Sequence, residues 1–271
     1  MPELPEVETI RCGLEPLVVG HRIVGVALRN RALRWPVPEK LQEILNGQVI
    51  HAVERRAKYL MLRCQSGTLI LHLGMSGSLR ILPKQKNPTK HDHVDIVFSN
   101  GRCLRYNDPR RFGALLWTSS DPVQHELLKD LGPEPLTASL TGDYLYERSR
   151  RRIVSIKQFI MDSRIVSGVG NIYANEALFT AGIQPVKAAG RISRKRYQRL
   201  AAAIKKTLRT AIAAGGTTLR DFQDESGNPG YFQMKLKVYG RGGEPCLVCG
   251  KKIRSIRKGQ RSTFYCPRCQ H

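Results

Sequence analysis

The sequence predicts an α+β protein with more than one domain, and three observations support this prediction. Segments of strand character dominate residues 23–117, whereas helical periodicity begins after residue 150. Two Cys-x-x-Cys pairs stand at the C-terminal end. At 271 residues the chain is long enough for about two domains. We therefore expect a β-rich first part, a helical second part and a terminal metal finger.

A short helix is expected near the N-terminus. Pro5 suits a first helical turn, and apolar residues follow it with helical spacing, at Val7, Ile10 and Leu14. Gly13 and Pro16 are expected to stop this helix. The residues before it, 2–4, would then form a tail with a free end.

Four β-strands are predicted in the first part, over residues 51–64, 68–73, 94–98 and 103–106. Asn100-Gly101 lies between the last two strands and is typical of a tight hairpin turn. The segment 131–136 contains two prolines and a glycine, and it is predicted to be a linker.

Three helices are predicted beyond this linker. The first two, over 153–161 and 172–180, are joined by a glycine-containing turn whose backbone N–H groups suit a phosphate. A longer helix is capped by Ser193 and ends at Gly215. One face of this helix is apolar and consists of Tyr197, Leu200, Ala201, Ile204, Leu208 and Ala211.

The charge of the chain gives the first indication of a partner. The 45 Lys and Arg residues and 22 Asp and Glu residues give a net charge of +23, of which residues 133–271 carry +17. A surface of this kind gains affinity for phosphates by releasing counterions. Nucleic acid is therefore the leading partner, ahead of an anionic membrane or the ribosome, and a basic face without a partner is the remaining alternative.

Neither membrane insertion nor export is expected. The longest stretch without a charged residue covers the 16 residues 64–79 and contains polar side chains, so it is too short and too polar to cross a bilayer. The N-terminus is acidic and lacks the basic and apolar segments of a leader. We expect a cytoplasmic protein.

The spacing of the cysteines indicates a zinc site. Cys246, Cys249, Cys266 and Cys269 form two pairs separated by 16 residues, so that a hairpin can bring four thiolates together. Four thiolates leave no open coordination position, and the zinc ion is therefore predicted to be structural. Two disulfides are the alternative, but the odd total of seven cysteines and the absence of an export signal disfavour them.

The second residue can carry chemistry if the initiator Met1 is removed. Pro2 would then have a secondary amine, and an amine with a pKa of roughly 8 is partly neutral near pH 7 and can attack a sugar C1′. The resulting iminium cation labilises the neighbouring C–H bond, so that base excision can lead on to strand cleavage. Glu3 lies beside this amine and can donate or accept a proton. Without further motifs, a proline at position 2 and a glutamate beside it are common and do not indicate an activity.

Five further motifs stand in order before the finger. They are Pro2-Glu-Leu-Pro-Glu-Val-Glu-Thr9, Lys58-Tyr-Leu, His72-Leu-Gly-Met-Ser-Gly-Ser-Leu-Arg80, Asp108-Pro-Arg-Arg-Phe-Gly113 and Gly168-Val-Gly-Asn-Ile-Tyr173. Together with the finger they resemble bacterial formamidopyrimidine-DNA glycosylase, a family that removes oxidised purines. The resemblance covers essentially the whole chain.

The resemblance implies a detailed fold and a substrate. It places an N-terminal β-sandwich with flanking helices at residues 1–132 and a linker at 133–137. A helix-two-turn-helix domain follows at 138–237, and a four-cysteine zinc β-finger ends the chain at 238–271. Residues 217–231 match a loop that closes over the everted base in relatives. The implied partner is damaged double-stranded DNA, bound by a monomer with one structural Zn2+.

The resemblance also implies the catalytic residues. Pro2 is the nucleophile, and Glu3 protonates the deoxyribose ring oxygen and later shuttles protons. Lys58 contacts a phosphate beside the lesion and assists catalysis. Arg261 is positioned by the zinc finger to hold the pinched backbone.

Further residues are implied to bind DNA. Met75, Arg110 and Phe112 fill the gap left by the flipped nucleotide, and Arg110 pairs with the orphan cytosine. The remaining phosphate contacts fall to His72, His91, Lys157, Asn171 and Tyr239.

The implied activity is that of a glycosylase for 8-oxoguanine and formamidopyrimidines, combined with a β,δ-lyase that cuts at the resulting abasic site. Two alternatives remain open. Endonuclease VIII is a relative that uses the same amine chemistry on oxidised pyrimidines, and Leu4 and the loop 108–113 favour the purine enzyme over it. A noncatalytic zinc-finger protein that binds DNA or ribosomes would explain the charge and the cysteines but would give Pro2 and Glu3 no task.

Overall fold

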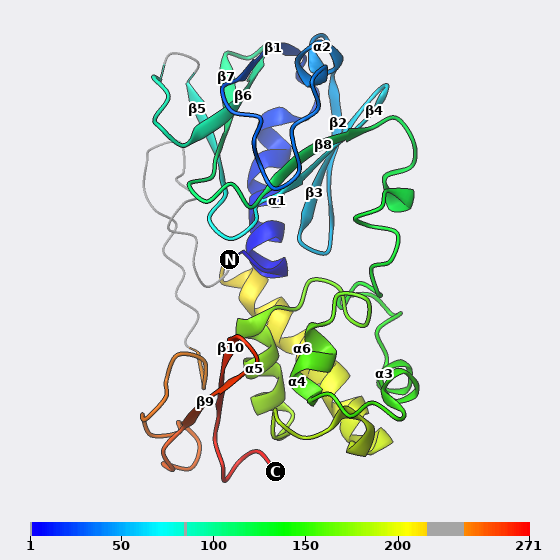
Figure 1. Ribbon diagram of the computed structural model, residues 1–271, viewed down its shortest axis with the longest axis vertical. Helices are drawn as coiled ribbons and strands as arrows, with labels where there is room; N and C mark the ends of the chain where they lie inside the picture. Colours follow the sequence, from blue (N-terminus) through cyan, green and yellow to red (C-terminus); the bar gives the residue numbers. More distant parts are fainter. Residues whose placement is uncertain (1, 84–85, 216–235) are drawn as a thin grey trace. The chain divides into compact units, whose positions relative to one another are not determined.

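The computed structural model describes residues 2–83, 86–215 and 236–271. They form two compact units (Figure 1). The first unit contains the described residues up to Lys129 together with Gly215, and the second contains Asp130–Ala214 and the described residues from 236 onwards. None of the helices in the described ranges combines the length and the apolar character needed to span a membrane.

The first unit is built on two four-stranded antiparallel sheets (Figure 1). One sheet has the order β1-β6-β7-β5 and the other has the order β2-β3-β4-β8. The strands are β1 (Ile23–Leu28), β2 (Ile50–Arg56), β3 (Tyr59–Cys64), β4 (Gly67–His72), β5 (Ser78–Pro83), β6 (Asp92–Phe98), β7 (Arg102–Asn107) and β8 (Ala114–Thr118). Both sheets share one hydrophobic core with the helices α1 (Leu4–Val18) and α2 (Leu41–Leu45). The predicted β-sandwich with flanking helices is thereby confirmed.

The N-terminal helix is longer than the sequence predicts. α1 continues through Gly13 and Pro16, so the prediction that these residues stop the helix is wrong. The prediction of a tail over residues 2–4 is wrong as well, because Leu4 is already helical. One face of α1 is buried in the core, at Val7, Ile10, Leu14 and Val18. Burial contributes roughly 1.5–3 kcal/mol for each such side chain and outweighs the penalty of about 1 kcal/mol for a helical glycine.

Residues 51–64 form two strands rather than the single strand predicted. β2 ends at Arg56, and β3 begins at Tyr59 and pairs with it in antiparallel register. Ala57 takes a left-handed φ of 54° in the turn between them, and Lys58 follows it. The turn contains no Gly, Pro or Asn, so its sequence carries no hairpin signal. The predicted hairpin turn between β6 and β7 is confirmed, with Gly101 at φ 77°.

A buried polar cluster crosses the sheet β1-β6-β7-β5. Arg105 donates to both carboxyl oxygens of Asp95 at 2.8 Å, and Arg29 donates to the same carboxyl group. Arg105 also donates to the backbone carbonyl groups of Lys86 and Asn87. Burial alone would raise the pKa of Asp95, but the hydrogen bonds from the two guanidinium groups outweigh it and hold this pKa below its usual range.

The second unit is helical and ends in a β-hairpin (Figure 1). Its helices are α3 (Gly142–Ser149), α4 (Ile156–Met161), α5 (Asn171–Thr180) and α6 (Arg194–Ala213), and they share a second hydrophobic core. The hairpin consists of β9 (Arg254–Lys258) and β10 (Arg261–Tyr265), and β10 packs on α5. Two short 3-10 helices, η1 (Pro122–Gln124) and η2 (Ala189–Arg191), complete the described elements of the two units.

The predicted linker is attached to the second unit. The Gly132 N–H donates to the Ser163 carbonyl group at 2.8 Å, and the Ser167 N–H and hydroxyl both donate to the Pro133 carbonyl group. In the same unit, Ser193 occupies the N-cap position of α6, as predicted, but its side chain makes no capping hydrogen bond within the described residues. The four domain ranges derived from the sequence stay a prediction.

The buried Asp95 predicts how the stability of the first unit depends on pH. A carboxyl group whose folded pKa is lowered contributes stability above its unfolded pKa, about 3.9, and this contribution is lost as the pH falls through the folded pKa. We therefore expect the free energy of unfolding to fall between about pH 5 and pH 3. Asp95→Asn should flatten this dependence and destabilise the unit at pH 7 by about 3 kcal/mol, because one partner of a buried pair is lost.

Urea unfolding followed by tryptophan fluorescence measures this effect, because the chain contains only two tryptophans, Trp35 and Trp117, and both lie in the first unit. The exposed residue Glu39 provides a control, and Glu39→Gln should leave the free energy of unfolding at pH 7 unchanged. The prediction would be contradicted if the free energy of unfolding of Asp95→Asn changed with pH as steeply as that of the wild type.

Candidate active site

The first residues of the chain lie at the N-terminal end of α1. Glu3 is the N-cap residue, is only 2% exposed, and donates its backbone N–H to Glu6 Oε2 at 2.9 Å. Pro2 precedes it and is half-buried. α1 packs on β2 and β3, the two strands joined by the turn that contains Lys58. Pro2 is therefore the residue directly before a buried helix cap.

His72 lies at the end of β4 and near Lys58. Its ring centroid lies 4.7 Å from that of Tyr59, its partner on β3, and the two rings are tilted by 37°. The Gly74 N–H donates to His72 Nδ1 at 3.2 Å, so a neutral ring carries its proton on Nε2 and can donate from there. Burial lowers the pKa of His72 to about 4, assisted by the positive charges of Lys58 and Arg34. The side chain is thus an uncharged hydrogen-bond donor at neutral pH.

Two adjacent loops carry the apolar side chains implied to enter DNA. Met75 is 46% exposed and Phe112 is 41% exposed, although residues of this kind usually lie in a core. The Arg110 guanidinium lies over the Phe112 ring at 4.7 Å. Asp108 is fully buried and its N–H donates to the His91 carbonyl group at 3.1 Å. The first unit thus brings Met75, Arg110, Phe112 and the backbone of His91 to one set of connected loops.

The second unit contains the other implied DNA-contacting residues. Arg261 is exposed at the start of β10, beside a pocket of about 250 Å³ that it lines together with Lys157. Lys157 is only 4% exposed, and its Nζ donates to the Ser262 carbonyl group at 2.7 Å and to Thr263 Oγ1 at 2.8 Å. Asn171 begins α5, and its buried Oδ1 accepts no hydrogen bond within the described part of the chain.

Two buried polar residues of α5 attach the finger, and the sequence did not reveal them. Glu176 accepts the N–H groups of residues 237–239 at 2.9 Å each, which fixes the backbone of Tyr239. Asn175 accepts the Phe264 N–H at 2.8 Å. Their signal in the sequence is weak, because it consists only of two adjacent polar residues within a helix that is otherwise largely apolar.

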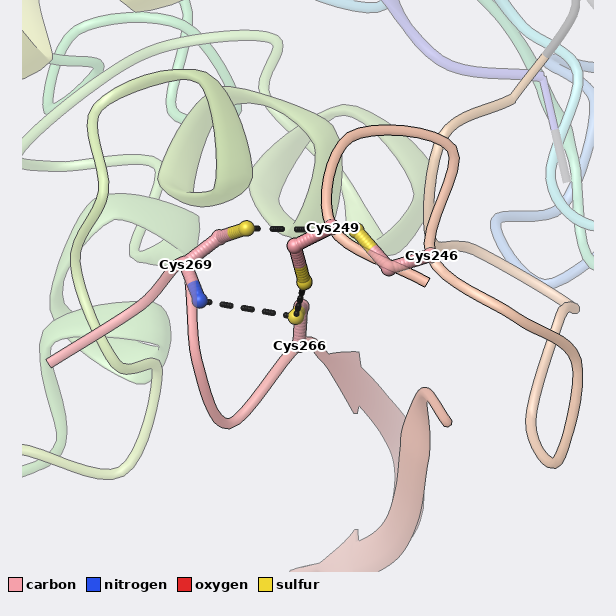
Figure 2. Close-up of side chains that lie close together, drawn as sticks. All are labelled: Cys246, Cys249, Cys266 and Cys269. Carbon is pink, nitrogen blue, oxygen red and sulfur yellow. Dashed lines mark hydrogen bonds between the residues drawn. The ribbon is translucent and has the colours of Figure 1, made fainter. Parts of the chain in front are cut away.

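The four cysteines of the two Cys-x-x-Cys pairs lie together (Figure 2). All four Sγ atoms lie within 4.8 Å of one another. Sγ–Sγ distances are 3.9 Å between Cys246 and Cys269 and 3.4 Å between Cys249 and Cys266. Tetrahedral zinc with Zn–S bonds of about 2.3 Å requires sulfur atoms about 3.8 Å apart. The four thiolates therefore fit one structural zinc ion.

The predicted loop at residues 217–231 lies outside the described residues. Nothing in the described ranges bears on it.

Comparisons with known proteins identify the family. The model of the formamidopyrimidine-DNA glycosylase N-terminal domain matches residues 1–115, that of the H2TH domain of the same enzymes matches 131–223, and that of a zinc finger found in FPG and IleRS matches 243–271. The formamidopyrimidine-DNA glycosylases of Syntrophotalea carbinolica and Pseudomonas aeruginosa are 58% and 59% identical to the chain over 270 residues, covering 100% of both partners. The chain belongs to the formamidopyrimidine-DNA glycosylase family.

Solved structures of the family share the fold. The Thermus thermophilus MutM (FPG) protein superposes with a TM-score of 0.87 at 37% identity, covering 99% of this chain and 98% of that one. The Lactococcus lactis Fpg in complex with an abasic site containing DNA has a TM-score of 0.91 at 34% identity over 100% of both chains. Because the zinc-finger model and the cysteine cluster agree, the protein has one structural zinc ion.

The environment of His72 predicts an unusual titration. We expect its ring to stay neutral, with the proton on Nε2, down to about pH 5, because burial and two nearby cations disfavour the imidazolium form. Nitrogen-15 NMR of the histidine side chains measures this, and His72→Gln assigns the signal among the seven histidines. Lys58→Met should raise the pKa of His72 by removing a positive neighbour. A midpoint between pH 6 and pH 7 in the wild type would contradict the prediction.

The cysteine cluster predicts the effect of removing one zinc ligand. Cys249→Ser should reduce bound zinc, measured by native mass spectrometry, from one ion to none, because three thiolates hold zinc far less tightly than four. Cys12→Ser is the matched control, since Cys12 lies exposed on α1 in the other unit. The tryptophan-detected unfolding of the first unit should be the same in both variants. Retention of one zinc ion by Cys249→Ser would contradict the assignment.

Proposed function

We propose that this protein is a base-excision repair enzyme that removes 8-oxoguanine and formamidopyrimidines from damaged duplex DNA and cuts the strand through an intermediate at Pro2. It combines a DNA glycosylase with the abasic-site lyase activity typical of its family. The observation that carries this proposal is the full-length match to glycosylases at 58% identity. In this chain, Pro2 directly precedes the N-cap residue of a helix that has one buried face, which supports its proposed role.

The proposed reaction begins at the amine of Pro2. Its nitrogen attacks C1′ of the damaged nucleotide, the glycosidic bond breaks, and the base leaves with a proton. Glu3 protonates the deoxyribose ring oxygen, which opens the ring and leaves an iminium cation between Pro2 and C1′. Loss of a C2′ proton expels the 3′ phosphate, and a second elimination expels the 5′ phosphate. Water then hydrolyses the iminium bond and restores the amine.

The proposed phosphate contacts use side chains of both units. Lys58 supplies a cation, and neutral His72 supplies an Nε2–H donor, as a phosphate oxygen requires. His91, Asn171, Tyr239 and Arg261 make further contacts with the backbone of the strand. Lys157 contributes by holding β10, the strand that begins with Arg261.

The proposed flipping of the damaged nucleotide uses the exposed side chains of the first unit. Met75 and Phe112 enter the space that it leaves, and Arg110 pairs with the opposite cytosine. Unstacking costs a few kcal/mol, which the apolar contacts of these side chains offset.

The partner and the location follow from this function. Related Lactococcus lactis proteins have been crystallised with DNA containing an abasic site and with DNA containing Fapy-dG, which supports damaged duplex DNA as the partner of this chain. The net charge of +23 suits that partner. We propose that the enzyme acts as a monomer, in the cytoplasm and on the nucleoid.

A displaced amine provides a direct test of the role of Pro2. Insertion of one alanine between Met1 and Pro2 keeps every native residue but converts the Pro2 nitrogen into an amide, which cannot attack C1′. We expect this variant to bind an 8-oxoguanine duplex while giving no covalent complex with borohydride. Glu3→Gln should slow excision by roughly 10²–10⁴-fold, as loss of a general acid does.

The control for these variants is Glu15→Gln, a change at a partly exposed side chain further along α1. It should react at the wild-type rate. Intact mass must show that Met1 is absent from the wild type. Full excision activity in the alanine-insertion variant would refute the proposal.

A further inference from the structure

Asp108 begins the loop that carries Arg110 and Phe112, and its side chain contacts the loop that carries Met75. Its Oδ1 accepts the Ser76 hydroxyl at 2.6 Å. Its Oδ2 accepts the Gly113 N–H at 2.9 Å and the Tyr106 hydroxyl at 3.1 Å. One carboxyl group therefore holds the residue that follows Met75 and the residue that follows Phe112.

The backbone around Asp108 extends this connection. Ser76 Oγ accepts the Arg110 N–H at 3.2 Å, so the serine bridges the two loops a second time. The carbonyl oxygen of Asp108 accepts the Arg111 N–H at 3.2 Å and lies 2.8 Å from His93 Nε2. These contacts join the first loop (residues 73–77) and the second loop (residues 108–113) into one hydrogen-bonded unit.

The two loops also touch at their backbones. A Cβ atom added to Gly74, which has a φ of 61°, would lie 2.4 Å from the Phe112 carbonyl carbon. The same Cβ atom would lie 2.6 Å from the Gly113 nitrogen. Because no side chain separates the loops at these points, a displacement of one loop must be passed to the other.

The burial of Asp108 restricts the two loops to one relative position. The residue is 0% exposed and forms no ion pair within the described part of the chain. A buried carboxyl group is tolerated only where its oxygens are hydrogen-bonded, and here the donors come from Ser76, Tyr106 and Gly113. Loss of one donor leaves part of the carboxyl group unsatisfied, so the loops favour a single relative position.

We propose that Asp108 is a positioning residue that makes the two loops a single rigid wedge. Insertion of Met75 and Phe112 into the duplex is then coupled to the pairing of Arg110 with the opposite base. This inference rests on the proposed function. Since a preorganised wedge loses less conformational freedom on entering the duplex, the coupling should act on eversion of the damaged base. An abasic nucleotide has no base to unpair, and its cleavage should depend less on the wedge.

The experiment compares two single-turnover reactions for each variant. One is excision of 8-oxoguanine opposite cytosine or adenine, and the other is cleavage of a preformed abasic site. 2-Aminopurine beside the lesion reports insertion of the wedge by its fluorescence. The variants are Asp108→Asn, Ser76→Ala and Tyr106→Phe, with Ser76→Thr to restore the hydroxyl.

The matched stability control is Leu104→Ala. Leu104 is a buried core residue on β7, the strand that also carries Tyr106, and it makes no polar contact with the loops. This variant lowers thermal stability without breaking the hydrogen bonds of Asp108. If the other variants act only by lowering stability, their rate losses in the two reactions should match those of Leu104→Ala.

We expect Asp108→Asn and Ser76→Ala to slow excision opposite cytosine by about tenfold or more, as loss of a buried hydrogen bond does, with a smaller effect on abasic-site cleavage. The 2-aminopurine signal should be delayed, discrimination between cytosine and adenine should fall, and Ser76→Thr should restore both. If Asp108→Asn does not fold, Ser76→Ala and Tyr106→Phe decide the question.

Equal losses in both reactions, matching those of Leu104→Ala, would overturn the inference. So would unchanged 2-aminopurine kinetics in the folded variants. A wild-type chain that does not excise 8-oxoguanine would instead refute the proposed function, which makes the two failures distinguishable.

Discussion

The burial of one face of α1 is the constraint on which the proposed chemistry depends. Val7, Ile10, Leu14 and Val18 pack into the core that both sheets share, and this packing holds the helix in one position despite Gly13 and Pro16. A nucleophile on a loose N-terminal tail would rarely meet C1′ in a productive orientation, because orientation supplies much of the rate of such a reaction. The buried helix gives the Pro2 nitrogen a fixed point of attachment, and Glu3, its cap, shares that position.

A different principle fixes the finger. The apolar cluster around it is small and consists of Phe179 from α5, Val238 and Ile253 beside two cysteines. Zinc and buried polar contacts therefore supply the stability that hydrophobic packing does not provide here. Glu176 and Asn175 on α5 and Lys157 on α4 each hold backbone or side-chain groups of the terminal segment. These contacts set the start of β10, where Arg261 lies exposed.

The sequence predicts the fold class and the zinc cluster well, because both depend on local pattern. Strand alternation, helical periodicity and cysteine spacing are properties of neighbouring residues. The errors arise where tertiary packing overrides local preference. Pro16 lies within a helix because the opposite face is buried, and the strand break before Tyr59 occurs at Ala57, which has no turn signature.

The site itself could be predicted only through the family motifs. Pattern alone would place Met75 and Phe112 in a core, whereas both are exposed. Asp108 belongs to a motif that the sequence displays, and two of its donors, Tyr106 and Gly113, lie within five residues of it, but the donor that joins the two loops is Ser76, 32 positions away in the chain. Such contacts are set by the folded sheets and carry no local signal.

The most direct measurement of the central claim is the site of attachment in the reduced enzyme–DNA adduct. Wild-type protein would be reacted with an 8-oxoguanine duplex, reduced with borohydride and digested, and the modified peptide would be sequenced by tandem mass spectrometry. The account predicts a deoxyribose remnant on the nitrogen of Pro2, in a peptide that lacks Met1. A remnant on Lys58 or on any other lysine, with Pro2 unmodified, would contradict it.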